Sequence, residues 1–412
     1  MSEAVNIPQL RFPEFNGAWE EKKLGEVVRY TKGFAFKSND YVDSGVRIIR
    51  VSDLGAESIK KDNKSIYLSS ENEHLYDKWK IRKNNIVITT VGSNPDLIES
   101  AVGRGIFIIN DNEGLLNQNM LKLENSTQVN NKFVHCFINS PKYIHHIKAI
   151  KRGNANQANI TVKELLDFKL SITTKPEQQK IAAFLNAVDT KIEQLSKKQE
   201  LLGEYKKGLM QQIFSQVIRF KADDGSEFPD WEERVLGDYL AHKSKKNKNN
   251  EVDLVLSVSN KKGFITQDEQ FDGYQVASKD LTNYKIVEKG EYAYNPSRIN
   301  VGSIARLKNN TIGIVSPMYV VFKLKNLDSI FFDNLYQTHL FKHLIKVGCS
   351  GSVRDSLNFN DMADFVFSFP SLEEQAKIAN FLSSIDSKIE QVGKQLDESK
   401  QFKKALLQQM FV

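Results

Sequence analysis

Two stretches of this chain, residues 25–172 and 237–369, are rich in side chains that can hydrogen-bond to phosphates and to the edges of bases. Arginine pairs with guanine, and asparagine or glutamine with adenine, through two hydrogen bonds, whereas serine, threonine and lysine commonly bind phosphate. In each stretch these side chains gather in three places: after an early strand, in a loop after a middle strand, and in a polar loop before the last strand.

The three places correspond between the two stretches, but the residues in them differ. The first stretch supplies Arg47, Arg50 and Ser52; Thr89, Thr90, Ser93 and Asn94; and Lys151, Arg152, Asn154, Asn156, Gln157 and Asn159. The second supplies Ser257, Ser259, Asn260, Lys261 and Lys262; Asn295, Ser297, Arg298, Asn300 and Ser303; and Ser350, Ser352, Arg354 and Ser356. Any one of these side chains is more simply interpreted as part of a solvated turn. As sets that occur in both stretches, they predict contact with DNA.

Three further features have a simpler structural interpretation than a functional one. The basic run His242–Lys248 is expected to be a solvated or mobile loop, with phosphate contact as the alternative. His145 and His146 have no further ligand at metal-binding spacing, so we expect structural or surface histidines and no metal site. Cys136 and Cys349 lie far apart and lack the CxxC spacing, so we expect buried free thiols.

The sequence carries no motif for catalysis. It has neither the GxxxxGK[ST] phosphate loop nor a GxGxxG turn after a strand, and no local signature of a nucleophile. Asn295–Arg298 (NPSR) superficially resembles the NPP[YF] motif of amino-methyltransferases, but it lacks the second proline and the aromatic residue that would stack on a flipped base. We therefore interpret NPSR as a loop, and the chain as a reader that is not itself an enzyme and binds no cofactor.

Composition sets the scale of the molecule. A chain of 412 residues can form two or more domains, and 40% hydrophobic with 26% charged residues is typical of a globular protein. The net charge of +6 favours a polyanionic partner only weakly, because 51 acidic residues are interspersed among 57 basic ones. No apolar run approaches the roughly 18 residues of a membrane helix, and the first residues have no signal-peptide pattern. We therefore expect a cytoplasmic protein with no membrane partner.

An internal repeat indicates which elements position the candidate residues. Glu177–Phe214 recurs as Glu374–Phe411 without a gap and with half of the positions identical. The repeat extends upstream, where the order FP, WEE, LG occurs in Phe12–Gly25 and again in Phe228–Gly237. A repeat this long indicates two equivalent halves.

Each copy of the long repeat carries an apolar stripe with heptad spacing. The stripe consists of Leu185, Val188, Ile192, Leu195, Leu202 and Leu209 in the first copy and of Leu382, Ile385, Ile389, Val392, Leu396 and Leu406 in the second. Polar residues interrupt it at Gln199 and Ser399 and again at Lys206 and Lys403, where Tyr205 and Phe402 are expected to continue the stripe. Helix-favouring residues and the absence of proline within the heptads predict two helices of about 57 Å each.

A narrow apolar stripe needs a partner that covers it. Because the two copies are equal in length and similar in charge pattern, we expect them to form an intramolecular antiparallel coiled coil. The alternatives are that each helix packs on its own domain, or that the stripes join two copies of the chain.

Between the repeated elements, the two variable stretches resemble each other only in outline. Short apolar runs alternate with polar turns and predict strands at 46–51, 86–91, 105–109, 252–258, 292–294 and 312–322. A helical pattern at 131–150 and at 332–347 precedes the last strands, at 169–172 and 366–369. We predict an α/β (α+β) fold with a pseudo-two-fold repeat: mixed globular domains at 1–172 and 217–369, and long antiparallel helices at 173–216 and 370–412.

The duplicated motif [EQ]QxKIAxFLxxxDxKIEQ resembles the conserved regions of the specificity subunit of type I restriction-modification enzymes. The central and C-terminal positions of the motif are similar to that family, and so are the paired openings LRFPEFNGAWEEKKLGEV and SEFPDWEERVLGDY. The resemblance covers the whole chain. The helical repeats are its most specific part, whereas the variable domains match in position and size.

The resemblance implies two target-recognition domains, each docking in the major groove at one half of a split, asymmetric site on double-stranded DNA. The helices would be the spacer between them. It also implies two methyltransferase subunits that clasp the helices, and two restriction subunits that act as ATP-driven motor and nuclease. S-adenosylmethionine, ATP and Mg would then be bound by those partner subunits.

Two other interpretations stay open at this point. The chain could be the recognition subunit of a related system in which modification and cleavage share one polypeptide. It could also be a coiled-coil scaffold protein whose globular domains bind protein partners.

Overall fold

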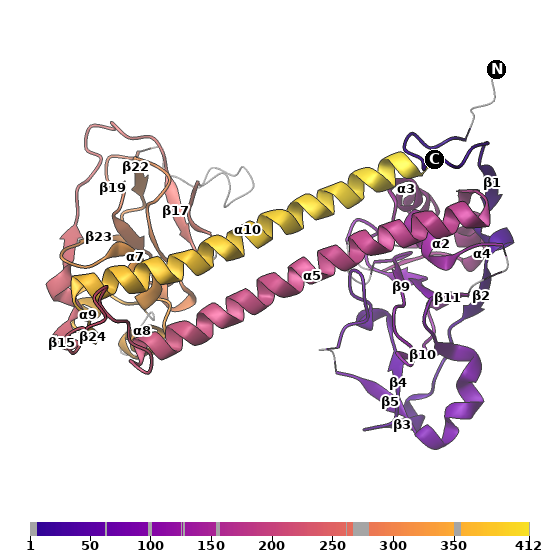
Figure 1. The fold of residues 1–412 in the computed structure, drawn as a ribbon, viewed down its shortest axis with the longest axis horizontal. Coiled ribbons are helices and arrows are strands. Elements are labelled where there is room, and N and C mark those ends of the chain that lie inside the picture. The colour runs from indigo at the N-terminus through magenta and orange to yellow at the C-terminus, as the bar shows by residue number, and fades with distance from the viewer. Residues whose placement is uncertain are drawn as a thin grey trace. The chain divides into compact units, whose positions relative to one another are not determined.

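The chain folds into two compact units, coloured by residue number in Figure 1. The computed structural model describes residues 6–61, 64–97, 101–124, 126, 128–153, 157–260, 262–266, 280–349 and 356–411. Unit 1 comprises Met1–Leu195 and Gln395–Val412, and unit 2 comprises Ser196–Lys394. Two long helices, α5 (Lys175–Phe214) and α10 (Leu372–Met410), each contribute residues to both units, and both lie within the segments predicted as helical.

Both units use the same frame of two short strands placed just before and after the variable part. In unit 1, β1 (Glu20–Lys23) pairs antiparallel with β14 (Lys169–Ile172). In unit 2, β15 (Glu232–Val235) pairs antiparallel with β24 (Val366–Phe369). The two glutamates of each WEE motif therefore begin the first strand of the pair. The second strand of the pair is the predicted last strand of the variable stretch, and that prediction is confirmed.

The LG motif after each first strand closes this frame. The N–H of Leu24 donates to the Phe168 carbonyl at 2.8 Å, and the N–H of Leu236 donates to the Phe365 carbonyl at 2.7 Å. The following glycine permits close packing, because a Cβ on Gly25 would lie 3.1 Å from a side-chain atom of the short helix that precedes β14. The variable part of each unit thus begins and ends at one fixed point.

The variable part of unit 1 contains an antiparallel four-stranded sheet in the order β2-β11-β7-β9. A five-stranded sheet in the order β3-β5-β4-β10-β6 includes one parallel pair, β4 with β10. A small third sheet has the order β12-β13-β8. The strands are β2 (Arg29–Lys32), β3 (Tyr41–Val42), β4 (Val46–Ile49), β5 (Ile66–Leu68), β6 (Lys80–Ile81), β7 (Ile86–Thr89), β8 (Val91–Gly92), β9 (Gly105–Phe107), β10 (Gly114–Leu116), β11 (Met120–Glu124), β12 (Arg152–Gly153) and β13 (Ala158–Asn159).

The helical pattern predicted at 131–150 forms two helices instead of one. Asn139 adopts a positive φ of 73°, which is incompatible with a continuing right-handed helix. The Ser140 hydroxyl then accepts a hydrogen bond from the Tyr143 N–H, and Pro141 occupies the first turn of the new helix. The helices of the variable part, with the short helix α1 at its start, are α1 (Leu24–Val27), α2 (Asn131–Phe137), α3 (Pro141–Ile150) and α4 (Val162–Leu166).

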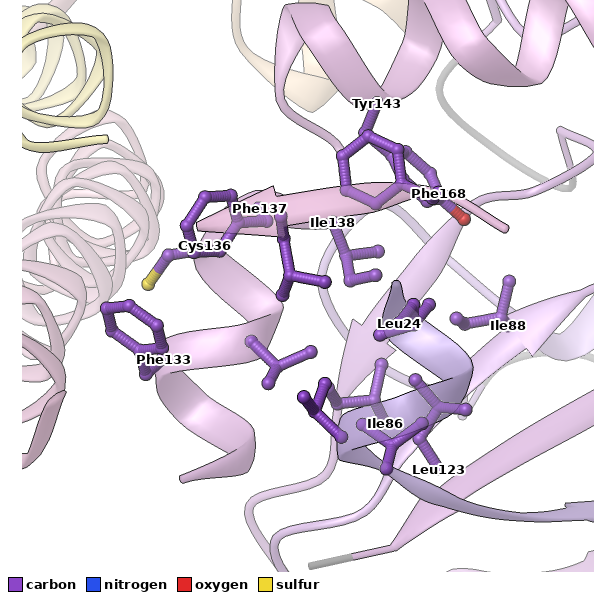
Figure 2. Close-up of a cluster of buried hydrophobic side chains, with 14 of the residues drawn as sticks. Leu24, Ile86, Ile88, Leu123, Phe133, Cys136, Phe137, Ile138, Tyr143 and Phe168 are labelled. Atoms are coloured by element: carbon purple, nitrogen blue, oxygen red, sulfur yellow. The ribbon is translucent and has the colours of Figure 1, made fainter. Parts of the chain in front are cut away.

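The main core of unit 1 joins the four-stranded sheet to α2, α3 and the ends of both long helices. Figure 2 shows part of this cluster, in which Ile86 and Leu123 of the sheet lie with Phe133 and Phe137 of α2. It also contains residues from the beginning of α5 and from the end of α10, namely Ile181, Leu185, Leu406 and Met410. Burial of each such aliphatic or aromatic side chain stabilises the fold by roughly 1.5–3 kcal/mol.

Unit 2 repeats this architecture with different strands. Its four-stranded antiparallel sheet has the order β16-β23-β20-β21, and two further pairs are β17-β18 and β19-β22. The described strands are β16 (Leu240–Lys243), β17 (Leu256–Ser259), β18 (Gly263–Thr266), β19 (Lys285–Glu288), β20 (Tyr292–Tyr294), β21 (Ile304–Arg306), β22 (Ile312–Val315) and β23 (Val320–Leu324), and the described α-helices are α7 (Ser329–Leu335), α8 (His339–Cys349) and α9 (Phe359–Ala363). The core is rich in aromatic rings, such as the stacked pair Tyr292 and Phe322, with ring centroids 5.2 Å apart.

The predicted antiparallel coiled coil is seen within each unit. The beginning of α5 lies with the end of α10 in unit 1, and the end of α5 lies with the beginning of α10 in unit 2. The predicted stripe faces inward: Leu185, Ile192, Leu195, Leu382, Ile385, Val392, Leu396 and Leu406 are buried, and Val188, Leu202, Leu209 and Ile389 are half-buried. The prediction for Tyr205 and Phe402 is wrong, because their side chains are 56% and 53% exposed. Each ring lies next to the polar break in sequence and so points to the outer face of its helix.

The second polar break is a charged pair in each unit. In unit 1, Lys403 of α10 lies 2.6 Å from a carboxylate oxygen of Asp189 of α5, and Lys132 of α2 lies 2.7 Å from the other oxygen. In unit 2, Lys206 of α5 lies 2.7 Å from Asp386 of α10. The two lysines occupy equivalent positions of the repeat, and so do the two aspartates. The same pair therefore forms twice, with the lysine on α10 in unit 1 and on α5 in unit 2.

A buried Glu-Gln pair fixes the start of each long helix. In unit 1, the carboxylate of Glu177 accepts hydrogen bonds from Arg11 at 2.7 and 2.8 Å. Its neighbour Gln178 accepts a hydrogen bond from the Asn130 N–H at 2.9 Å, which satisfies the residue that caps α2, and donates to the Thr173 carbonyl at 2.8 Å. Both side chains are almost fully buried.

Unit 2 contains the same arrangement. Glu374 binds Arg219 at 2.8 Å, and Gln375 accepts from the N–H of Asp328, the residue that caps α7, at 2.9 Å. Gln375 also donates to the Pro370 carbonyl at 2.9 Å. The repeated Glu-Gln therefore joins three separate parts of each unit: the long helix, the segment that carries the arginine, and the helix that covers the main sheet.

The end of α10 also contacts the N-terminal segment in unit 1. The Leu10 N–H donates to the Gln409 carbonyl at 2.9 Å, and Trp19 packs edge-on against Phe411 with centroids 6.2 Å apart. In unit 2, the chain leaving α5 turns back directly, and the Ile218 N–H donates to the Gln212 carbonyl at 3.2 Å. In unit 2, this contact joins segments that are neighbours in the chain. In unit 1, the equivalent contact joins Leu10 to Gln409, which are far apart in the sequence.

Gln178→Ala should lower the free energy of unfolding of the chain by about 1–3 kcal/mol, because it leaves the partly buried Asn130 N–H and Thr173 carbonyl without their partner. Gln179→Ala is the matched control, since Gln179 is the exposed neighbour on the same helix, and it should change stability by less than about 0.5 kcal/mol. Urea-induced unfolding followed by circular dichroism measures both. Equal effects of the two substitutions would contradict the role of Gln178.

The charged pair in unit 1 predicts a loss of stability in acid. Burial alone would raise the pKa of Asp189, but the hydrogen bonds and charges of Lys132 and Lys403 outweigh it, so the pKa lies below the ordinary value of 3.8. A carboxylate whose pKa is lowered by folding contributes stability above its unfolded pKa and loses that contribution as the pH falls through its folded pKa. Asp189→Asn should therefore cost about 1–2 kcal/mol at pH 7 and flatten the decline in stability below pH 4.

Urea midpoints measured between pH 7 and pH 3 test this expectation. Asp397→Asn is the matched control, because Asp397 is an exposed carboxylate on α10 in the same unit. The control should follow the wild-type profile. An Asp189→Asn profile parallel to that of the wild type would show that the charged pair does not cause the acid sensitivity.

Candidate DNA-recognition surfaces

In unit 1, the second and third places of candidate residues come together in the small sheet. β8 pairs with β13, which pairs with β12. Beside this sheet, the Ile160 N–H donates to the Thr90 carbonyl at 2.9 Å. The loop after β7 and the loop before the last strand therefore form one continuous surface where β7 ends.

The corresponding loops of unit 2 meet in a similar way. The Leu357 N–H donates to the Pro296 carbonyl at 3.2 Å, which joins the loop after β20 to the loop before the last strand. The first place of unit 2 also contacts these loops. The hydroxyl of Ser303, in the loop after β20, donates to the carbonyl of Val258 in β17 at 2.9 Å. A Cβ on Gly302 would lie 3.6 Å from the Cβ of Asn260. In unit 2, the described parts of the three places thus lie beside one another.

Arg47 and Arg50, predicted to contact DNA, are held by the protein itself. The Arg50 guanidinium donates to both oxygens of the buried Asp53, at 3.1 and 3.2 Å, and to the Lys64 carbonyl at 2.6 Å. Arg47 donates to the Lys60 carbonyl at 2.7 Å and lies 3.7 Å from Asp53. Both arginines fix the turn around Asp53, so the structure gives them a structural role instead of the predicted one.

Three predicted hydroxyl groups are buried. Thr89 is fully buried and donates to the Ala101 carbonyl at 2.6 Å. Ser257 is 7% exposed within β17, and Ser303 is 3% exposed. The prediction of surface contact is wrong for these residues, because a hydroxyl at the end of a strand can be satisfied by a neighbouring carbonyl as well as by a ligand.

The other described candidates of unit 1 lie on or near its surface. Ser52, Gln157 and Asn159 are exposed, and Thr90, Ser93 and Asn94 are half-buried. Lys151 donates to the Asn94 side chain at 3.3 Å and so links the third place to the second.

The exposed Arg152 is bound to a carboxylate. It donates to both oxygens of Glu164, at 2.7 and 2.8 Å, and this hydrogen bonding lowers the pKa of Glu164 to about 2. The pair is therefore ionised at neutral pH. Arg152 would have to leave Glu164 in order to pair with a base in the same two-bond geometry.

In unit 2, the loop after β20 presents the most accessible candidates. The Asn295 side chain accepts from the Ser297 N–H at 3.1 Å, which shapes the loop and leaves Ser297 exposed. Arg298 and Asn300 are also exposed, around the short 3₁₀ helix Ile299–Val301. Among the first-place residues, Asn260 and Lys262 are exposed, Ser259 is half-buried, and Ser356 of the third place is half-buried. The NPSR segment is a loop, as predicted.

Several predicted residues lie outside the described part of the chain. These are Asn154, Asn156, Lys261, Ser350, Ser352 and Arg354. Their roles stay predictions.

Two polar features beside these loops were not found from the sequence. The loop Asn117–Asn119 between β10 and β11 abuts the second place, because the Asn119 carbonyl accepts a hydrogen bond from the Thr90 N–H at 2.8 Å. Gln118 in its centre is exposed. The other feature is Arg104, which precedes β9. The run Asn-Gln-Asn between two apolar strands could have indicated this loop. Arg104 has no such signal in the sequence, because it stands alone between two glycines.

The basic run His242–Lys248 is only partly the predicted solvated loop. Its first two residues end β16, and Asn247 is buried, where it donates to the Val252 carbonyl at 2.8 Å. The exposed charges of the run are Lys245, Lys246 and Lys248.

Cys136 and Cys349 are buried free thiols, as predicted, and burial raises the pKa of Cys136 to about 12. His145 is exposed, and His146 lies 2.9 Å from the Glu164 carbonyl. Among the described residues, no three histidine, cysteine or acidic side chains are grouped so that they could hold a metal ion.

The helices in the described part of the chain include none that is long and apolar enough to span a membrane.

A duplicated frame that carries two different sets of polar loops defines a protein with two related but unequal units. Residues 16–202 and 229–398 match the family described as the type I restriction modification DNA specificity domain. Because the match covers most of the chain, the chain belongs to this family. Its sequence is 22% identical to a protein of Methanocaldococcus jannaschii named putative type I restriction enzyme MjaX specificity subunit, over 98% of this chain and 95% of that one.

Two further comparisons agree with this assignment. The chain is 22% identical to the type I restriction enzyme MjaVIII specificity subunit of the same organism, over 97% of this chain and 92% of that one. The crystal structure of a type I restriction-modification system S subunit from M. genitalium has the same fold, with a TM-score of 0.59 and 16% identity over 98% of this chain and 99% of that chain.

Proposed function

We propose that this chain is the DNA sequence-specificity subunit of a type I restriction-modification complex. It binds a split, asymmetric site on double-stranded DNA through two recognition domains, 1–172 and 217–369, and directs partner enzymes to that site. The long helices at 173–216 and 370–412 serve as the spacer. The chain supplies recognition and is not itself an enzyme, and it acts in the cytoplasm.

The observation that carries this proposal is the contrast between the repeated frame and its loops. The Glu-Gln pairs, the strand pairs and the LG turns are the same in both units. The loops at the end of each main sheet differ in length and in residue type, with Ser93 and Asn94 in unit 1 and Asn295, Arg298 and Asn300 in unit 2. Different side chains on the same frame suit two half-sites of different sequence, because base identity is read by individual side chains.

The duplication also supports binding of partners in equal numbers. Tyr205 and Phe402 occupy equivalent positions of the repeat, and both rings are more than half exposed. Exposed aromatic rings are common anchors of protein–protein interfaces, so the helices offer a similar anchor twice. We assign this surface to two methyltransferase subunits, which bind S-adenosylmethionine. Two restriction subunits, which use ATP and Mg, complete the complex.

Selection of bound fragments from duplex DNA of random sequence tests the proposal. The chain, assembled with its methyltransferase subunits, should enrich a site with two specified segments separated by unspecified base pairs. Each correct base pair should contribute about 1–3 kcal/mol. If no split site is enriched while the purified chain captures protein partners, the scaffold function would explain the fold better.

Arg298→Ala should relax specificity in one segment of the enriched site and leave the other segment unchanged, because Arg298 belongs to unit 2 alone. Loss of one two-bond arginine–guanine pair should cost about 1–3 kcal/mol of discrimination at one position. Arg234→Ala is the matched control, since Arg234 is an exposed arginine of unit 2 that is bound to Glu232 at 2.7 Å. An equal loss in both segments would indicate that Arg298 supports folding and not recognition.

A further inference from the structure

Arg104 differs from the other half-buried arginines in the described part of the chain. Arg11 and Arg219 bind the Glu-Gln pairs, Arg47 and Arg50 bind the turn at Asp53, and Arg306 binds Asp333 at 2.8 Å. Unlike them, the Arg104 guanidinium makes no hydrogen bond or ion pair with a described residue. Its Nε–H is buried without a partner, as are those of Arg47 and Arg306. A partly buried cation without an acceptor is costly, so a ligand that supplies acceptor atoms would be favoured there.

The backbone of Arg104 is held in place from several sides. Its N–H donates to the Ala101 carbonyl and its carbonyl accepts from the Thr89 N–H, both at 3.1 Å. The preceding carbonyl, that of Gly103, accepts a hydrogen bond from the buried Tyr143 hydroxyl at 2.6 Å.

The two glycines that flank Arg104 are required by packing. Gly103 has a φ of 76°, and a Cβ there would lie 2.8 Å from Ile147. A Cβ on Gly105 would lie 2.5 Å from Ile138. The arginine is therefore presented from a rigid backbone, so a ligand does not have to order the chain before it binds.

Arg104 also lies beside the loops of the candidate surface of unit 1. Ala101, to which its N–H is bonded, forms a bridge with Ser93, and the Val102 N–H donates to the Ser93 carbonyl at 3.0 Å. The next residue, Asn94, is joined to Lys151 of the third place. The backbone that carries Arg104 thus lies beside the part of unit 1 where the second and third places meet.

The nearby charge distinguishes between two acceptors in DNA. Burial lowers the pKa of Arg104, and the carboxylate of Glu57 opposes this shift, so Glu57 lies within electrostatic range. Glu57 is mostly exposed and lies 4.0 Å from Lys403. No hydrogen bond or ion pair joins it to Arg104. A phosphate bound at Arg104 would be repelled by Glu57, whereas the O6 and N7 atoms of guanine carry no net charge.

We propose that Arg104 reads a guanine in the half-site bound by unit 1, through two hydrogen bonds from its guanidinium to O6 and N7. This inference rests on the proposed function, because it requires that unit 1 contacts the major groove of DNA.

Selection from duplex DNA of random sequence, with the chain assembled with its methyltransferase subunits, tests the role of Arg104. The wild type should enrich a split site with a fixed guanine in one segment. Arg104→Ala should reduce the preference for that guanine roughly 5- to 150-fold and leave the other segment unchanged. Arg104→Lys should restore little of the preference, because a lysine ammonium cannot form the planar two-bond fork.

Two controls separate recognition from folding. Arg82→Ala removes an exposed arginine of unit 1 that is bound to Asp77 at 2.8 Å, and it should leave the selected site unchanged. If Arg104→Ala does not fold, Arg104→Met keeps the apolar stem and should show the same loss of preference with a wild-type unfolding midpoint.

Each other outcome has a defined meaning. A loss of affinity that is uniform across sequences, restored by Arg104→Lys and accompanied by a salt dependence reduced by about one ion, would overturn the proposal in favour of a phosphate contact. An unchanged site would show that Arg104 does not contact DNA. Failure of the wild type to enrich any split site would refute the proposed function itself.

Discussion

The buried Glu-Gln pair at the start of each long helix is the interaction on which the two units depend. A carboxylate that is removed from water must be paired, and Glu177 and Glu374 are each paired with an arginine from the segment that precedes the frame. The adjacent Gln178 and Gln375 satisfy the backbone of the helix that covers the main sheet. Two neighbouring side chains therefore tie the long helix, the incoming chain and the sheet layer together, and the variable part can differ without disturbing them.

This constraint explains why the repeated residues and the candidate contact residues do not coincide. The frame requires particular partners for its buried polar groups, so Glu, Gln and the LG turns recur. The loops at the end of the sheet are bonded mainly through their backbones, as in the bonds of Ile160 to Thr90 and of Leu357 to Pro296. Backbone bonds tolerate any side chain except proline at the donor, which leaves the side chains free to specify a ligand.

The long helices, their inward stripe and the strands at the frame were predictable because their spacing in sequence maps directly onto one face of a helix or one short strand. Predictions failed where a partner decided the outcome. Arg50 resembles a base-reading residue until its bonds to Asp53, three residues later, are seen. Thr89 is satisfied by the carbonyl of Ala101, twelve residues later, and Gln178 and Glu177 act on residues that no local pattern indicates. Arg104 was missed because the lack of a partner has no sequence signature.

The bond between Leu10 and Gln409 makes the two units unequal in a way that does not involve their loops. In unit 2, the segment with Arg219 follows α5 directly, so chain connectivity keeps it at high effective concentration near Glu374. In unit 1, the segment with Arg11 is held at the end of α10 by non-covalent contacts alone. Local opening of this segment would release Arg11 from Glu177 while the rest of the chain stays folded. We therefore expect chemically equivalent anchors to detach unequally, because only the segment with Arg219 follows a long helix directly in the chain.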